Sequence, residues 1–170
     1  MNLALQEILV DSGEVKVCGA EGILRAHAIG SCVVVAGYDA SSALGGMAHV
    51  MLPGAYHGWF PTLKTKYATD ALGELCYLME RQGTSAARFS LCLVGGGNVL
   101  GDGHQSPGPD IVRSLEGLLA RQGIRPVALE VGGRQRKSCT LHVARGCVMY
   151  TVGDSEQRLL WQAAGMALSP

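Results

Sequence analysis

The sequence has almost no net charge, few aromatic residues and no long apolar run. Its 14 basic and 14 acidic side chains balance, so it lacks the basic excess of a general nucleic-acid binder. Aromatic residues make up 5%, too few to indicate a surface for stacked bases. No segment reaches the ~18 apolar residues of a membrane helix, and the first residues do not resemble a secretory signal. We therefore expect no nucleic-acid partner, no membrane insertion and a cytoplasmic location.

The cysteines also lack a pattern. None of the six belongs to a Cys-x-x-Cys pair, and in a cytoplasmic protein most should be reduced, small and buried. No cysteine or histidine pair has the spacing of a zinc finger, so we predict neither a metal nor a cofactor. A less favoured alternative is a metal site built from Cys32, His49 and one of His27, His57 or His104.

Glycine and apolar residues are abundant instead. The 24 glycines among 170 residues indicate many turns, and an apolar content of 48% is enough for a packed core. Apolar alternation and β-branched runs predict strands near residues 3–10, 15–23, 33–38, 47–52, 89–93, 126–131, 139–143 and 147–152. The segments 32–38 and 46–52 are spaced like neighbouring strands joined by a short turn.

Two segments have apolar residues at three- and four-residue steps, which predicts helices over about 68–79 and from about 110 to a stop at Gly123. Asp154 and Gln157 resemble a capping box, which predicts a final helix with Leu159, Leu160 and Ala163 on its apolar face. The fold class is therefore α+β. We expect residues 1–170 to form a single layered domain of mixed β-sheets flanked by helices.

One cysteine and one histidine stand out by position. Cys32 follows Gly30 and Ser31 at a turn that opens a strand, and His49 lies 17 positions later in the next strand. A neighbouring imidazole can lower a thiol pKa and return the proton to a leaving group. Backbone N–H groups at this turn could stabilise an oxyanion. From the residues alone, the alternative is that both side chains belong to the core.

The residues around this pair resemble the CheD family of bacterial chemoreceptor glutamine deamidases. Two motifs carry the resemblance in the same order and separation: I-G-S-C-V-V-V at 29–35 and G-G-M-A-H-V-M-L-P at 45–53. Looser matches are K-Y-A-T-D at 66–70, V-G-G-G at 94–97 and E-V-G-G at 130–133. The resemblance covers about residues 14–152 and leaves the predicted helical tail, 153–170, outside it.

This resemblance implies a cysteine hydrolase in which Cys32 is the nucleophile and His49 the general base and acid. The implied architecture is similar to that of deamidating-toxin-like cysteine hydrolases. The implied substrate is a glutamine side chain of a methyl-accepting chemotaxis receptor, converted to glutamate through a thioester with release of ammonia. The implied partners are these receptors and a CheC-type phosphatase of the chemotaxis pathway.

The sequence departs from the family at Ala26, where the family usually has a threonine that completes the catalytic group. Alanine cannot form a side-chain hydrogen bond, so the third role is vacant or filled by Ser31, His27 or a backbone carbonyl. The alternative function is a weakly active or inactive CheD-like binding protein that docks to chemoreceptors or to the phosphatase. Retention of Cys32 and His49 favours the enzyme, because an adaptor needs neither.

Gly95, Gly97 and Gly101 follow a predicted strand and suggest a phosphate-binding loop. No helix follows them directly and their spacing fits no standard fingerprint, so we do not favour this interpretation. As part of a deamidase, the glycines would border the active-site cleft instead.

Two surface features have two interpretations each. Trp59 and Phe60 form an apolar loop tip that either covers the core or contacts a partner or substrate. Arg134, Arg136 and Lys137 either belong to a solvated turn or meet an acidic receptor surface.

Overall fold

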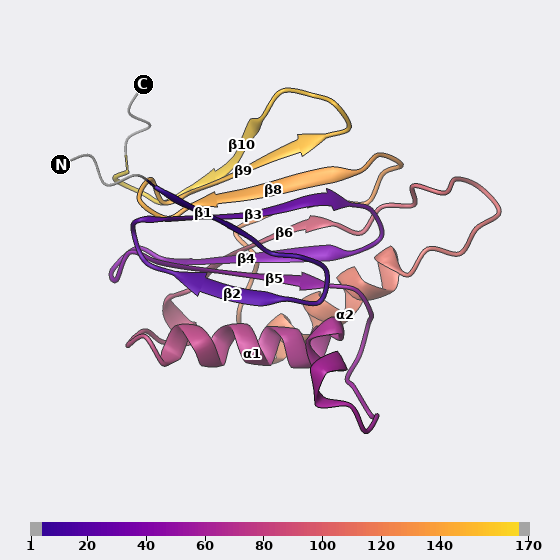
Figure 1. Ribbon diagram of the computed structural model, residues 1–170, viewed down its shortest axis with the longest axis horizontal. Coiled ribbons are helices and arrows are strands. Elements are labelled where there is room, and N and C mark those ends of the chain that lie inside the picture. Colours follow the sequence, from indigo (N-terminus) through magenta and orange to yellow (C-terminus); the bar gives the residue numbers. More distant parts are fainter. Residues whose placement is uncertain (1–4, 167–170) are drawn as a thin grey trace.

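Two β-sheets and two helices form three stacked layers in the computed structural model, which describes residues 5–166 (Figure 1). The first sheet has the order β1-β3-β8-β9-β10, with bounds Gln6–Leu9, Gly22–Ile29, Lys137–His142, Cys147–Val152 and Arg158–Gln162. The second sheet has the order β2-β5-β4-β6-β7, with bounds Val15–Cys18, Leu44–Val50, Val33–Asp39, Ser90–Gly95 and Ala128–Val131.

Helices α1 (Ala68–Glu80) and α2 (Gly108–Arg121) both lie against the second sheet, on the face that turns away from the first sheet (Figure 1). Two short 3-10 helices, η1 (Pro61–Lys66) and η2 (Ala86–Arg88), flank α1. β1 pairs with β3 and β6 with β7 in parallel, and the other pairs are antiparallel. The predicted α+β architecture of mixed sheets flanked by helices is confirmed.

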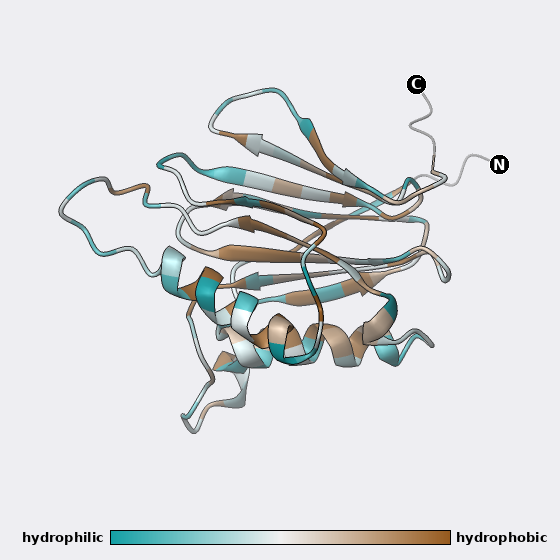
Figure 2. Cartoon of the chain, turned by 180° about the vertical axis from the view of Figure 1, so that it is seen from behind, coloured by the Kyte–Doolittle hydropathy of each residue, from teal (hydrophilic) through white to brown (hydrophobic). Residues whose placement is uncertain are grey.

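Strand β4 lies at the centre of two hydrophobic cores. Val33 and Val35 point toward the helices, whereas Val34 and Ala36 point toward the first sheet. All seven residues of β4 are buried, which explains why this segment reads as a continuous apolar run without polar alternation. Figure 2 shows the same arrangement, with the apolar colours concentrated in the second sheet and on the inward faces of the helices.

Both predicted helices are confirmed within two or three residues of their expected ends. The apolar stripe of α1 is buried at Ala68, Ala71, Leu72, Leu75 and Met79, and that of α2 at Ile111, Leu115 and Leu119. The chain leaves each helix through a glycine with positive φ, +92° at Gly83 and +70° at Gly123. Within residues 5–166, no helix combines the length and apolar character needed to cross a membrane.

The predicted pairing of the strands around residues 32–38 and 46–52 is confirmed, but β5 begins earlier than expected. Gly45 and Gly46 lie inside the strand instead of before it. A Cβ on Gly45 would lie 2.5 Å from a methyl carbon of Val143, and one on Gly46 would lie 2.6 Å from a methyl carbon of Leu75. The two glycines therefore let the first sheet and α1 approach β5 closely from opposite sides.

The predicted helix in the tail is wrong. Residues 158–162 form β10, which extends the first sheet by pairing antiparallel with β9, Arg158 opposite Tyr150. Trp161 packs edge-on against Tyr38 with ring centroids 6.2 Å apart, which anchors the strand over the core. The residues of the supposed capping box lie in the turn before it, where Gln157 donates a hydrogen bond to the Thr140 hydroxyl. Pairing with the open edge of β9 overrides the helical pattern of this short segment.

The first predicted strand is shorter than expected, since β1 starts at Gln6, and part of the prediction lies outside the described residues. The same holds for residues 167–170 of the predicted tail.

Candidate active site

Cys32 and His49 lie on the same face of the second sheet, the one that faces the first sheet. His49 pairs directly with Val34, and the Cys32 position lies two residues before Val34 along the chain. The Cys32 side chain packs beside the core between the sheets, the side to which Val34 and Met47 also point. Such diagonal neighbours are about 7–8 Å apart along the backbone, within reach of long side chains. The structure therefore places the two predicted residues on one sheet face, at diagonal positions of neighbouring segments.

His49 is buried, with 3% of its surface exposed, and its orientation is fixed by the N-terminal segment. Its Nδ1 lies 3.1 Å from the carbonyl oxygen of Val10. A carbonyl can only accept, so Nδ1 carries the proton and donates it. The neutral imidazole then has its lone pair on Nε2, which is buried without a hydrogen-bond partner among the described residues.

The turn at residues 10–14 holds the backbone of His49 as well. The N–H of Gly13 donates to the His49 carbonyl at 2.7 Å, and the N–H of His49 donates to the Glu14 carbonyl at 3.0 Å. The Thr65 hydroxyl bonds to the carbonyl of Gly13 at 2.6 Å and ties the turn to η1. We call this segment, residues 10–14, the N-terminal strap.

Burial lowers the pKa of His49, although the bond to Val10 and the carboxylates of Asp11 and Glu14 act in the opposite direction. The imidazole is therefore neutral at pH 7 and able to accept a proton at Nε2. Burial also raises the pKa of the Cys32 thiol, opposed by hydrogen bonds from the Ser12 hydroxyl and from the backbone N–H of Cys32 itself. At this thiol, desolvation outweighs these contacts.

A glycine-rich loop supports the nucleophile turn from behind. The N–H of Gly96 donates to the Cys32 carbonyl at 2.7 Å, and that of Gly97 to the Gly30 carbonyl at 2.9 Å. Gly95 has a φ of +124°, and a Cβ there would lie 2.3 Å from the Cys32 carbonyl oxygen. These amides are occupied, so the loop does not offer them to a phosphate.

The Cys32 side chain lines a cleft of about 410 Å³, at the end of the second sheet where β4 begins. Gly30, Ser31 and Cys32 form one wall, and Asn98, Val99, Leu100 and Ser106 of the loop after β6 form another. Leu100 is 72% exposed, which gives the rim an apolar surface. Within the described residues, the amides of Ser31 and Cys32 bond to no backbone carbonyl. The Cys32 amide also contacts its own sulfur, which leaves the Ser31 amide available to a substrate oxygen in the cleft.

The other predicted residues are distributed around this centre. Ser31 and Gly30 line the cleft beside Cys32, whereas His27 is exposed on the outer face of the first sheet and lines another cavity. Ala26 is buried between the sheets opposite Cys139. Of the three alternatives for the role of the missing threonine, a backbone carbonyl contacts His49, and it belongs to Val10.

The structure does not assemble the alternative metal site. His57 is exposed in the loop after β5, His104 is exposed in the loop before α2, and His27 faces away from Cys32. Across residues 5–166, no three side chains of the His, Cys, Asp and Glu types are grouped as metal ligands.

The predicted burial of the cysteines holds for half of them. Cys92, Cys139 and Cys147 are buried, whereas Cys18, Cys32 and Cys76 are half-buried. Among the half-buried thiols, Cys32 lines the cleft described above.

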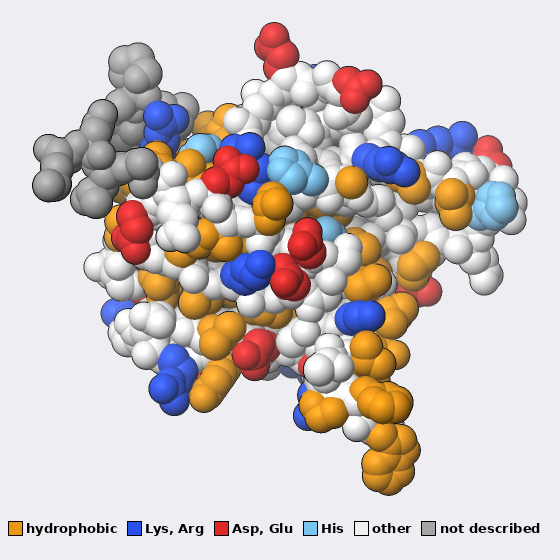
Figure 3. Space-filling view, viewed as in Figure 1, with side chains coloured by type: hydrophobic (Ala, Val, Ile, Leu, Met, Phe, Trp, Pro, Cys, Tyr) orange, Lys and Arg blue, Asp and Glu red, His pale blue; other side chains and the backbone are white. Residues whose placement is uncertain are grey.

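Trp59 and Phe60 do not cover the core. They are 95% and 68% exposed, on the loop that leaves β5. Figure 3 shows apolar side chains gathered on this projecting loop at the lower right. The Tyr56 hydroxyl accepts a hydrogen bond from the N–H of Phe60 at 2.8 Å, so a residue of the same loop holds the tip in place.

Sequence analysis missed the N-terminal strap. Val10 acts through its carbonyl, which no side-chain pattern reveals, and Ser12 belongs to an ordinary Asp-Ser-Gly turn. The only available signal was that this turn precedes a strand, β2, which pairs with β5.

The structure is a layered α+β protein in which Cys32 lines a cleft and His49 lies buried on the same face of the second sheet. Residues 51–152 match the family model described as CheD chemotactic sensory transduction. A protein of Chlorobium luteolum named probable chemoreceptor glutamine deamidase CheD is 32% identical over 91% of this chain and 77% of its own length. The chemoreceptor glutamine deamidase CheD of Thermotoga maritima is 28% identical over 88% of this chain and 94% of its own length.

A probable chemoreceptor glutamine deamidase CheD of Archaeoglobus fulgidus is 34% identical over 78% of this chain and 84% of its own length. The chain belongs to the CheD family.

Proposed function

We propose that this protein is a cysteine-dependent glutamine deamidase that converts glutamine side chains of chemoreceptors to glutamate. The observation that carries the proposal is the orientation of His49. The Val10 carbonyl holds its Nδ1–H, which leaves the Nε2 lone pair available on the face that also bears Cys32. The relatives' names supply the substrate class, and the cleft at Cys32 supplies a place for a carboxamide.

In the first half of the reaction, the Cys32 sulfur attacks the carboxamide carbon as the thiol proton moves to Nε2 of His49. The Ser31 amide, which bonds to no backbone carbonyl among the described residues, stabilises the oxyanion that forms. The imidazolium then gives its proton to the amide nitrogen. The C–N bond breaks, ammonia leaves, and a thioester remains on Cys32.

In the second half, water attacks the thioester carbon and Nε2 of His49 accepts one of its protons. The C–S bond breaks and the proton on Nε2 returns to the Cys32 sulfur. The glutamic acid side chain leaves and releases its remaining proton to solvent, which gives the carboxylate. The raised pKa of the thiol and the lowered pKa of the imidazole agree with a resting pair in which both groups are neutral. The imidazole then acts as a general base during attack.

The second candidate is a binding protein with little catalysis, suggested by Ala26 in place of a hydroxyl. The hydrogen bond between His49 and Val10 argues against it, because the imidazole has a partner without a threonine. Docking to a CheC-type phosphatase and action in the cytoplasm are compatible with either candidate and remain part of this proposal.

Mass spectrometry of a chemoreceptor cytoplasmic fragment tests the proposal. Incubation with the wild-type protein should convert specific glutamines to glutamate, a mass increase of roughly one unit per site, and Cys32→Ala should abolish it. Cys76→Ala is the matched control, because Cys76 is also half-buried but lies on α1 away from the cleft.

Conversion by the wild type and by Cys76→Ala, but not by Cys32→Ala, supports the enzyme. Conversion that survives in Cys32→Ala would exclude the proposed nucleophile. No conversion by the wild type, combined with tight binding to the fragment, would favour the binding protein.

A further inference from the structure

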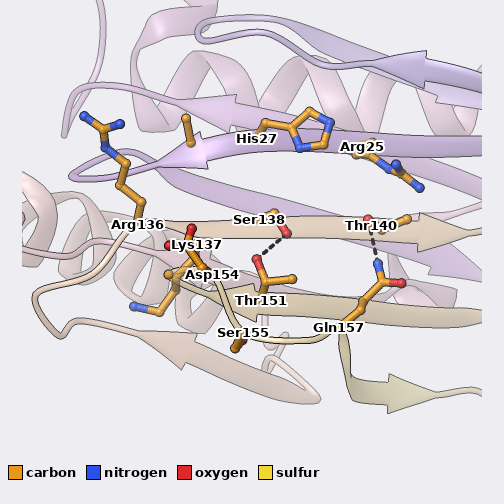
Figure 4. Close-up of a pocket in the computed structure, with 12 residues that line it drawn as sticks. Arg25, His27, Arg136, Lys137, Ser138, Thr140, Thr151, Asp154, Ser155 and Gln157 are labelled. Atoms are coloured by element: carbon orange, nitrogen blue, oxygen red, sulfur yellow. Dashed lines mark hydrogen bonds between the residues drawn. The ribbon is translucent and has the colours of Figure 1, made fainter.

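A polar groove adjoins the cleft on the outer face of the first sheet. It has a volume of about 620 Å³ and is formed by β3, β8, β9 and the turn after β9 (Figure 4). Hydroxyl groups line its floor. Ser138 and Thr151 share a hydrogen bond of 2.7 Å, and Gln157 donates to Thr140 at 3.1 Å. The proposed reaction uses none of these groups.

The groove and the cleft meet at two residues, Ala28 and Arg136, which line both. Ala28 lies in a bulge of β3 with a φ of +52°, an unusual conformation for a residue other than glycine. The Arg136 carbonyl accepts a 2.7 Å hydrogen bond from the N–H of Gly153, which fixes its backbone at the junction. A polypeptide that places one side chain in the cleft can therefore continue into the groove.

The groove has an excess of positive charge. Arg25, Arg136 and Lys137 line it, and Asp154 is the one carboxylate among its lining residues (Figure 4). Figure 4 shows Arg25 and His27 projecting from β3, with Arg136 at the left end of the groove. Arg25 is partly neutralised by Glu7 at 3.3 Å.

Arg136 differs from the other basic residues of its turn. Arg134 pairs with Asp102 at 2.6 Å, and the Lys137 ammonium donates to the Gly132 carbonyl. Arg136 is exposed, and within residues 5–166 no carboxylate lies within 4 Å of its guanidinium. It therefore presents a free cation where the groove meets the cleft.

We infer that this basic groove binds an acidic stretch of the protein substrate beside the target glutamine, with Arg136 as the principal contact. The inference rests on the proposed function, because it assumes that a glutamine side chain occupies the cleft. A planar guanidinium suits carboxylates, which it can hold through two parallel hydrogen bonds. The groove therefore selects which glutamines are modified, while Cys32 and His49 perform the reaction.

Deamidation of synthetic peptides with a single glutamine tests this inference. One set carries glutamates at positions four to eight residues from the glutamine on either side, a second carries lysines there, and a third carries serines. For the wild type, kcat/KM for the best acidic peptide should be at least about fivefold higher than kcat/KM for the serine peptide, because a few partly exposed charge pairs form. Arg136→Glu should remove this preference and favour the lysine peptide.

Arg125→Glu is the matched control. Arg125 is exposed and lies just before β7. Because β7 runs parallel to β6, Arg125 lies at the end of the second sheet where β6 begins, whereas Cys32 lies at the end where β6 finishes. This variant makes the same change in net charge and should keep the wild-type preference. The preference should also weaken between low and high salt, because partly exposed charges are screened.

The outcomes separate this inference from the proposed function. If no peptide and no receptor fragment is deamidated in a Cys32-dependent manner, the proposed function fails. If deamidation depends on Cys32 but the acidic, serine and lysine peptides react equally, the inference alone is overturned. The same holds if Arg136→Glu and Arg125→Glu change the preference equally.

Discussion

At the scale of single residues, the site depends on one proton position. Because the Val10 carbonyl accepts a hydrogen bond from Nδ1–H of His49, Nε2 is the ring atom left to accept a proton. A carbonyl on the main chain performs this orienting role without any side chain. This explains how the chain keeps an oriented imidazole although Ala26 replaces the threonine usual in the family.

The pKa of His49 predicts the acidic limb of the pH profile. The imidazole acts as a base only when neutral, and burial lowers its pKa below the ordinary value of about 6.5. Activity should therefore persist as the pH falls through 6.5 and decline only further toward acid. The measurement is kcat/KM for deamidation between pH 4.5 and 8.5. A limb centred at pH 7 or above would show that the imidazole is stabilised in its charged form.

Restoring a hydroxyl at position 26 tests whether the third role is vacant. Since His49 already has a partner in Val10, Ala26→Ser should change kcat by less than about threefold. The new hydroxyl lies in packed surroundings and should lower the free energy of unfolding by about 1–3 kcal/mol. Single-turnover deamidation and urea unfolding measure the two effects. A tenfold rise in kcat would mean that the carbonyl does not replace the threonine.

At the scale of elements, β4 and β5 form the rigid support of the site, and a carboxylate fixes the turn between them at the opposite end. Asp39 is 1% exposed, accepts hydrogen bonds from Ser41, Ser42 and Thr84, and lies 3.4 Å from Arg88. Burial alone would raise the pKa of Asp39, but the hydrogen bonds together hold it well below the ordinary range.

The depressed pKa of Asp39 predicts that the protein loses stability in acid. A carboxylate with a depressed pKa contributes stability above its unfolded pKa of about 3.9, and that stability is lost as the pH falls toward the folded value. Asp39→Asn should cost about 2 kcal/mol at pH 7 and progressively less at pH 4 and below. Urea unfolding from pH 3 to pH 7 measures the difference. The exposed Asp110→Asn is the control, and an Asp39→Asn cost that does not change with pH would contradict the assignment.

The sequence predicts an element well where its pattern is local, and less well where pairing with another segment of the chain determines the secondary structure. The apolar stripes of α1 and α2 and the β-branched run of β4 specify their own structures. The segment that became β10 has a helical pattern as well, and only the open edge of β9 makes it a strand. The N-terminal strap carries no periodic pattern, so its place over His49 follows from pairing between β2 and β5.

At the scale of the whole molecule, the site lies where the two sheets and a glycine-rich loop meet at one edge. Cys32 lies in the connection between β3 of the first sheet and β4 of the second, and His49 lies in β5. The places of Cys32 and His49 on one sheet face were predictable because their motifs are local, and the loop after β6 was expected beside the cleft. The strap and the groove around Arg136 were not predictable, because each joins segments distant in the chain.

The central claim is that the Cys32 thiol and the His49 imidazole act together in an accessible crevice. Its most direct test is alkylation by iodoacetamide at pH 7.5, followed for each cysteine by mass spectrometry in the wild type and in His49→Gln. We predict that Cys32 reacts at least about fivefold faster than Cys18 and Cys76, and that His49→Gln slows Cys32 alone. Equal labelling of all six cysteines, or a Cys32 rate unchanged in His49→Gln, would contradict the account.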